Sequence, residues 1–262
     1  MYYRELPAPA SAGHIIDRLW ILELESGPVQ RIVPDGRPEL ILNQGRPFES
    51  LRDGTWRPQP AAFFVGQLTG PLHIRPAGPA RIMGIRFRPE SAAALLRLPM
   101  HELNGREVPL SDLPRALHSL ADAPESINRL AQTCAPDLHI REAVRLIDAC
   151  AGVVDLARVA GRVGLGIRQF ERRFKDAVGI SPKLFCRIQR FQRVFHQIEA
   201  GGSWVHAALA CGYYDQAHLV RDFRAFSGEP PSALLANDDL ARHFLRYREK
   251  SHFSKTLCSG PA

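Results

Sequence analysis

One segment of this 262-residue chain occurs twice, and the repeat limits what the C-terminal third can fold into. The first copy, GLGIRQFERRFKDAVGISP, begins at Gly164, and the second, GYYDQAHLVRDFRAFSGEPP, begins at Gly212. Four pairs of residues match at one offset of 49 positions: Arg172 with Arg221, Phe174 with Phe223, Gly179 with Gly228 and Pro182 with Pro231. The opening glycines differ by 48, so the second copy has one more residue at its turn. An internal repeat indicates a duplicated structural unit.

Each copy has the residue order of a helix-turn-helix: a short apolar helix, a glycine turn and a basic helix. Small residues, Ala160 and Ala208, stand four positions before the turn glycines and let the two helices cross closely. The glycines at 164 and 212 can adopt the positive φ that such a turn needs. We expect helices over 155–163 and 167–177 in the first copy, and over 203–210 and 215–226 in the second.

A longer helix is expected between the copies, from Pro182 to about Ala200. Proline suits a first helical turn, and Ser181 can cap that end with its hydroxyl. Apolar residues recur along this segment with helical spacing and predict one buried face: Leu184, Ile188, Phe191, Phe195 and Ile198. The sequence therefore predicts two helix-turn-helix units joined by one helix.

The second helix of each unit has an apolar face and a polar one. Phe170 and Phe174 in the first copy, and Leu219 and Phe223 in the second, have the i, i+4 spacing of residues that anchor a helix to a core. The side chains between them are expected to face outward, and we take them as the DNA-contacting set: Arg168, Gln169, Glu171, Arg172 and Lys175, then Gln216, Ala217, His218, Arg221 and Arg224. Arginine can pair with guanine, glutamine with adenine, and glutamate with cytosine. Because Arg168 and Glu171 are replaced by Gln216 and Ala217 in the second copy, the pattern indicates two different half-sites.

The charge distribution agrees with an anionic partner. The net charge is +7, and residues 141–228 contain 14 Lys and Arg against 8 Asp and Glu. Most of the excess therefore lies with the repeat, and nearly all of it is arginine, which is suited to phosphate and guanine. The alternative, that these charges only solvate helix faces, does not account for two copies in register.

The region before the repeat is expected to be β-rich up to about residue 90. Short apolar runs at 31–33, 40–42, 63–65, 73–74 and 82–87 are separated by breaks at 34–38, 52–60 and 75–80. Short strands separated by such breaks are typical of a small sandwich or barrel. Helical segments are expected at 91–98, 113–120 and 127–134, before a break at Pro136. Trp20, Trp56, Phe63 and Phe64 could line a ligand cavity or simply form the core.

These patterns predict an α+β chain: a β-rich small sandwich or barrel that ends in helices over residues 1–138, an all-α domain over 139–236, and a polar basic tail over 237–262. One short helix is expected near 234–246. Five scattered cysteines without a CxxC pair indicate neither a zinc site nor disulfides but reduced, packed thiols. No signal peptide and no membrane-spanning stretch is apparent.

The C-terminal segments GLGIRQFERRFKDAVGISPKLF and GYYDQAHLVRDFRAFSGEPPSAL resemble the AraC/XylS family of bacterial transcription regulators. The resemblance covers residues 141–236 and implies a seven-helix domain whose two units enter adjacent major grooves. It places the base-reading positions on Arg168, Glu171, Arg172, Gln216, Ala217 and Arg221. One departure is Gly166, where the family prefers Ser or Thr as a helix cap. PDGRPELILNQG and GIRFRPESAAALLRLP resemble an uncharacterised domain often found ahead of this module. That placement implies a cupin-like sensor or dimerisation domain over residues 1–138.

The resulting hypothesis is a sequence-specific DNA-binding regulator, not an enzyme, in the bacterial cytoplasm on the nucleoid. Its expected partners are double-stranded DNA at a promoter or operator and RNA polymerase; a small-molecule effector and a second copy of the chain stay open. No catalytic residue, cofactor or metal is predicted. An enzyme within residues 1–140 is the first alternative, but this part has no cysteine up to residue 130 and no GxSxG, HExxH or P-loop motif. An adaptor whose basic helices bind acidic proteins is the second.

Overall fold

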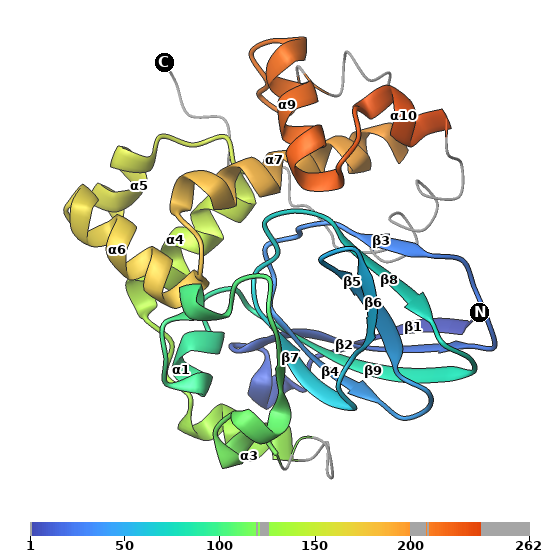
Figure 1. The fold of residues 1–262 in the computed structure, drawn as a ribbon. Coiled ribbons are helices and arrows are strands. Elements are labelled where there is room, and N and C mark those ends of the chain that lie inside the picture. The colour runs from blue at the N-terminus through green and yellow to red at the C-terminus, as the bar shows by residue number, and fades with distance from the viewer. Residues whose placement is uncertain (1, 119, 121–125, 200–207, 209, 237–262) are drawn as a thin grey trace.

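The computed structural model describes residues 2–118, 120, 126–199, 208 and 210–236. A β-rich part with short helices occupies the N-terminal half, and the described residues that follow it are mainly helical (Figure 1). The α+β class expected from the sequence is therefore confirmed. Helix α7 (Pro182–Glu199) separates two groups of helices, and the sheets lie below it in this view.

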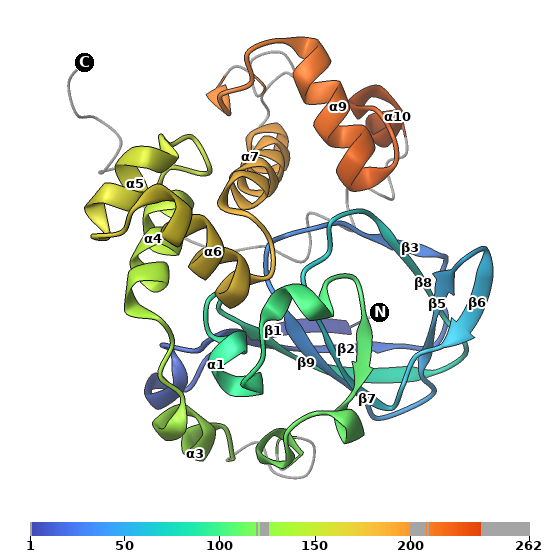
Figure 2. The same ribbon diagram turned by 60° about the vertical axis from the view of Figure 1, so that its left-hand side comes forward.

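Ten strands form two antiparallel sheets in the N-terminal part. The larger sheet has the order β1-β2-β9-β4-β7-β10, and the smaller has the order β3-β8-β5-β6. Their bounds are Tyr2–Pro7 (β1), Ile16–Leu24 (β2), Gln30–Ile32 (β3), Glu39–Asn43 (β4), Phe48–Arg52 (β5), Thr55–Pro58 (β6), Ala62–Val65 (β7), Leu72–Pro76 (β8), Ala80–Phe87 (β9) and Glu107–Pro109 (β10). The two sheets face one another in a sandwich (Figure 2).

The larger sheet packs on both faces, and its strand β4 contributes a continuous apolar run of Leu40, Ile41 and Leu42. In β4, Leu40 and Leu42 pack under the helices of this part, whereas Ile41 packs between the sheets. Packing explains why position 84 of β9 is a glycine: a Cβ there would lie 2.0 Å from Cε2 of Trp20. The indole of Trp20 occupies that space and forms one wall of the sandwich interior.

Short helices cover the outer face of the larger sheet (Figure 2). They are η1 (Ala10–Ala12), α1 (Ala92–Leu96), η2 (Met100–Leu103), η3 (Leu110–Asp112), η4 (Arg115–Leu117) and α3 (Ser126–Thr133). The helix expected over 113–120 is not continuous in the structure: Leu113 lies in a bend, Pro114 starts the single turn of η4, and Leu120 is helical. The expected break at 52–60 is wrong, since β6 lies within it and pairs with β5.

The helical part follows the sequence prediction closely in the residues described. Its helices are α4 (Leu138–Ala149), α5 (Leu156–Arg162), α6 (Ile167–Val178), α7, α9 (Gln216–Ser227) and α10 (Pro231–Ala236). Most of the expected helix at 203–210 and most of the expected helix at 234–246 lie outside the described residues, as does the tail from 237.

Side-chain caps explain where several of these helices begin. Asp137 and Asp155 each accept two backbone N–H bonds at the starts of α4 and α5. The hydroxyl of Ser181 accepts from the N–H of Leu184, as predicted. Gly166 precedes α6 without a side-chain cap, which also agrees with the sequence.

Candidate nucleic-acid interface

The two helix-turn-helix units share the backbone features that the repeat predicts. The turn glycines, Gly164 and Gly212, have φ of +72° and +73°. Ala160 and Ala208, the small residues of the first helices, are 1% and 8% exposed. Glycine at each turn thus adopts a left-handed conformation that a larger residue would strain.

Aromatic side chains fix the second helices, α6 and α9, to the core. Phe170 and Phe174 are fully buried in α6, with ring centroids 5.6 Å apart. Phe223 of α9 is fully buried against Phe191 of α7, at 4.9 Å. Each helix therefore has one face held by the core and the opposite face directed outward. The helices α6 and α9 lie on opposite sides of α7 in both ribbon views (Figures 1 and 2).

Nine of the ten predicted DNA-contacting side chains are exposed: Arg168, Gln169, Glu171, Arg172, Lys175, Gln216, Ala217, Arg221 and Arg224. His218 is half-buried, because its ring packs edge-on against Tyr213 with centroids 5.1 Å apart. The structure places one set on α6 and the other on α9. The two sets are separate, because α6 and α9 lie on opposite sides of α7.

Sequence reasoning missed the ion pairs that orient these helices. Arg173 of α6 bonds to Asp137 through both Nε (2.8 Å) and NH2 (2.7 Å). The equivalent position in the second copy is Asp222, which accepts from Arg187 of α7. The sequence offset of 49 relates positions 173 and 222, but it does not reveal the ion-pair partner of either residue. Tyr214, 92% exposed beside the second turn, was also overlooked as a surface residue.

A cavity of about 180 Å³ lies inside the sandwich. Its walls are mostly apolar and include Trp20, Ile41, Phe63, Ile74 and Ile82. Of the four aromatic residues named from the sequence, Trp20 and Phe63 line it. Trp56 instead lies under the guanidinium of Arg75, 4.4 Å from its ring centre, and Phe64 packs in the core on the other face of the sheet.

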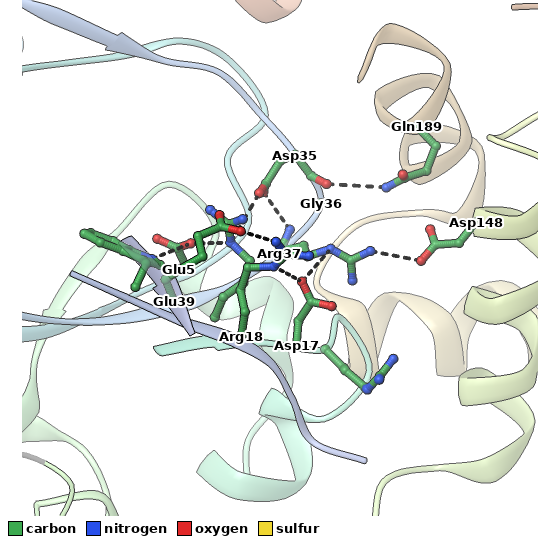
Figure 3. Close-up of polar contacts among 12 residues, drawn as sticks. Glu5, Asp17, Arg18, Asp35, Gly36, Arg37, Glu39, Asp148 and Gln189 are labelled. Atoms are coloured by element: carbon green, nitrogen blue, oxygen red, sulfur yellow. Dashed lines mark hydrogen bonds and ion pairs between the residues drawn. The ribbon is translucent and has the colours of Figure 1, made fainter. Parts of the chain in front are cut away.

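One end of this cavity is a network of buried charges (Figure 3). Nε of Arg86 bonds to Oε1 of Glu39 at 2.6 Å and lies 3.8 Å from a carboxylate oxygen of Asp35. Burial raises the pKa of Glu39, an effect that Arg86 opposes. Burial would also lower the pKa of Arg37, but Asp148, Asp17 and Asp35 more than reverse this, so Arg37 stays charged.

Among the described residues, no group of three or more His, Cys, Asp or Glu side chains is arranged to hold a metal ion. Three cysteines, Cys134, Cys186 and Cys211, are buried, and burial raises their thiol pKa values to about 11, 12 and 11. No helix in the described part of the chain is both long enough and apolar enough to cross a membrane.

Two family models match the chain. Residues 4–109 match a "Domain of unknown function (DUF6597)", and residues 159–237 match a "Helix-turn-helix domain" of the AraC type. Together these matches cover the β-rich part and both helix-turn-helix units. No curated protein matches the chain.

Solved structures of regulators resemble parts of the chain. A probable AraC family transcriptional regulator from Rhodopseudomonas palustris is 26% identical, over 38% of this chain and 97% of that one, with a TM-score of 0.35. ToxT from Vibrio cholerae, solved with an unsaturated fatty acid, is 9% identical over 82% of this chain and 93% of that one, with a TM-score of 0.42. A cupin domain of an XRE family regulator from Enterobacter cloacae is 17% identical over 34% of this chain and 99% of that one, with a TM-score of 0.27. The family models show that the chain carries a DUF6597 domain followed by an AraC-type helix-turn-helix domain, and this domain content supports a DNA-binding transcription regulator.

Proposed function

We propose that the chain reads two adjacent major grooves of one operator, with α6 in one and α9 in the other. One observation carries this proposal: two helices related by the repeat, α6 and α9, each present a basic face to solvent on opposite sides of α7. A recognition helix enters the major groove with its exposed face while the first helix braces it. The proposed base-reading set is the predicted one, with His218 contributing less because it is half-buried.

The two units should read different sequences. Arg168 and Glu171 of the first unit correspond to Gln216 and Ala217 of the second, so the chemistry offered to the bases differs. Arg172 and Arg221 are equivalent and both exposed, and each is proposed to do the same work in its own groove. One copy of the chain would then bind an asymmetric site.

Selection of bound sequences from random DNA by the full chain tests this proposal. We expect a non-palindromic motif with two half-sites about one helical turn, or roughly 10.5 base pairs, apart. Replacing both Arg172 and Arg221 with alanine should abolish enrichment. Recovery of a single half-site or of no motif would overturn the proposal, and binding that is equal on all sequences would indicate contacts to phosphate alone.

We further propose that an uncharged, largely apolar small molecule in the sandwich cavity modulates this binding. The charged side chains in its wall already have partners of opposite charge: Arg86 with Glu39, Arg37 with Asp148, Arg31 with Glu229, and Glu107 with Arg52. A charged ligand would have its own charge left uncompensated there, which is costly. A cavity of about 180 Å³ holds a molecule of roughly the size of one or two aromatic rings.

A matched pair of probes tests the ligand class. At pH 7, 2-naphthol is neutral and 2-naphthoate is an anion, while their ring systems are the same. We expect only 2-naphthol to raise the Tm of the full chain, and the Ile82→Phe substitution, which fills the cavity, to remove the shift. A larger shift with 2-naphthoate, or no shift with either compound, would contradict the proposed class.

The division of the chain is also a proposal: a sensor or dimerisation domain over 1–138, a DNA-binding domain over 139–236 and a basic tail over 237–262. Asp137 caps the first helix of the proposed second domain, which supports a boundary at this point. Limited proteolysis of the full chain should then cut first within the stretch that precedes α4.

A further inference from the structure

The loop between β3 and β4 is held by three glutamines through three successive backbone carbonyls. Nε2 of Gln192 donates to the carbonyl of Pro34 (2.6 Å), and Nε2 of Gln189 donates to that of Asp35 (3.4 Å). Nε2 of Gln67 donates to the carbonyl of Gly36 (3.0 Å). We call residues 33–37 the coupling loop. Two of the three glutamines belong to α7, which joins the two DNA-binding units.

Other residues of the coupling loop also contact the helices. NH2 of Arg37 bonds to Oδ2 of Asp148, at the end of α4, at 3.1 Å (Figure 3). Val33 is 6% exposed and belongs to the hydrophobic core of the helical part. Gly36, with φ of +80°, lies so close to α7 that a Cβ there would be 2.8 Å from Cε2 of Phe185. The loop is thus fixed to α4 and α7 by packing, hydrogen bonds and charge.

The same loop is a wall of the cavity. Val33, Asp35 and Arg37 line it, and so does Gln192 of α7. A molecule inside the cavity would therefore press on the residues that hold α7. Asp35 also links the coupling loop to the larger sheet, because its carboxylate lies beside Arg86, which is the ion-pair partner of Glu39.

A small movement of α7 would change the position of α9 relative to α6. The first unit is docked on the N-terminal part, where Nδ2 of Asn104 donates to the carbonyl of Gly179 at the end of α6 (2.7 Å). The second unit is attached through α7 and through an ion pair between Arg31 and Glu229 (2.9 Å). Because packed interfaces switch between discrete arrangements, a shift at the loop is expected to appear as a new position of α9.

We infer that the coupling loop transmits the state of the cavity to DNA binding, and that Gln189 and Gln192 are the residues through which α7 receives it. This inference rests on the proposed function, since affinity for the operator is its readout. Gln189 and Gln192 act on DNA only through α7, so they are positioning residues. Allosteric coupling between two sites typically changes affinity by 5- to 150-fold.

A double-mutant cycle on the full chain tests the inference without any ligand. Ile82→Phe fills the cavity from β9 and stands in for a bound molecule. Gln189→Leu combined with Gln192→Leu removes the two donors of α7 and keeps the side-chain size. The matched control is Gln197→Leu, which makes the same change further along the same helix. The dissociation constant for the selected operator is measured by fluorescence anisotropy for each protein.

We expect Ile82→Phe to change the dissociation constant at least about fivefold in the otherwise natural chain and in the Gln197→Leu background. In the Gln189→Leu/Gln192→Leu background the change should fall below about twofold. An equal change in all backgrounds, or no change in any, would overturn the inference. If Ile82→Phe does not fold, Ile74→Phe fills the same cavity from β8. Failure of the natural chain to bind any selected DNA would instead refute the proposed function.

Discussion

Arg187 of α7 donates two hydrogen bonds to one carboxylate oxygen of Asp222 in α9, from Nε at 3.0 Å and from NH2 at 2.8 Å. Asp222 is 1% exposed, and it stands between the proposed base-reading residue Arg221 and the core residue Phe223. In the first unit the equivalent position is Arg173, whose partner is Asp137. The repeat therefore keeps an ion pair at equivalent positions of α6 and α9 while reversing its charges.

Replacing Asp222 with alanine should destabilise the protein and weaken DNA binding. It leaves the guanidinium of Arg187 without its carboxylate, and a hydrogen bond to a charged group contributes about 1.5–3 kcal/mol. We expect the free energy of unfolding in urea to fall by about 2 kcal/mol, with lower affinity at the second half-site only. A loss at the first half-site alone would show that Asp222 does not orient α9.

Exchanging the pair, as Arg187→Asp with Asp222→Arg, provides the control. If the pair acts by mutual attraction, the double variant should recover part of the stability lost by either single variant. No recovery would mean that the burial of Asp222 depends on its other neighbours, such as Tyr213, whose pKa is raised first by burial and then by this carboxylate.

Arg221→Ala should lower the affinity for the selected operator by about 1–3 kcal/mol and relax the preference at one base position. An arginine that pairs with guanine contributes to discrimination, whereas one that touches phosphate does not. The comparison variant is Arg224→Ala, at another exposed arginine of α9. If the salt dependence of log Kd falls by about one for Arg221→Ala, with the base preference kept, Arg221 is a phosphate contact.

Gly36→Ala should be more damaging than Gly54→Ala, although both glycines have similar positive φ values of +80° and +75°. Alanine in this conformation costs about 1–2 kcal/mol at either site. At position 36 its Cβ would also lie 2.8 Å from Phe185 and 2.9 Å from Nε2 of Gln189, whereas the space at 54 is open. We expect an additional loss of about 1–3 kcal/mol for Gly36→Ala, measured by urea unfolding. Equal losses would mean that the coupling loop is not packed against α7.

The buried thiol of Cys186 should make the protein less stable in alkaline solution. Burial raises its pKa from 9.0 to about 12, so the folded state holds this proton more tightly than the unfolded chain does. The resulting stabilisation is complete below pH 9 and is lost as the pH rises toward 12. Between pH 8 and pH 10 the free energy of unfolding should fall by about 1 kcal/mol from this group.

Cys186→Ala should remove that part of the pH dependence, and the measurement is urea unfolding at pH 7, 8, 9 and 10. Cys150→Ala, at a half-buried position, is the comparison and should keep it. An unchanged slope in Cys186→Ala would show that other groups cause the alkaline loss.

The helix-turn-helix units could be predicted because their signals are local. A turn glycine, two apolar anchors at i and i+4, and an exit proline lie within about twenty residues, and each acts on its own helix. The same locality explains the correct placement of α6, which the structure gives as Ile167–Val178. Two copies of one pattern made the assignment specific, since chance matches at a common offset are rare.

The β-rich part was predicted only in outline. Strands β1 and β2 were not foreseen, although β2 is the longest, because their apolar residues are interrupted by charges such as Asp17 and Arg18. Those charges are half-buried and paired in the folded chain, where Asp17 has its pKa lowered by Arg37 and Arg18 against the effect of burial. A pattern based on hydrophobicity cannot show such compensation, because it comes from residues elsewhere in the chain.

The sequence by itself determined the duplicated DNA-binding units and the direction in which their basic faces point. Only the tertiary structure decided that PDGRP, which reads as a simple break between strands, is bound by Gln189 and Gln192, more than 150 positions away. The physical reason is that helix and turn preferences act over a few residues, whereas a carbonyl accepts a hydrogen bond from whatever donor the fold brings to it. The contact between the β3–β4 loop and α7 is thus a property of the fold and not of any local pattern.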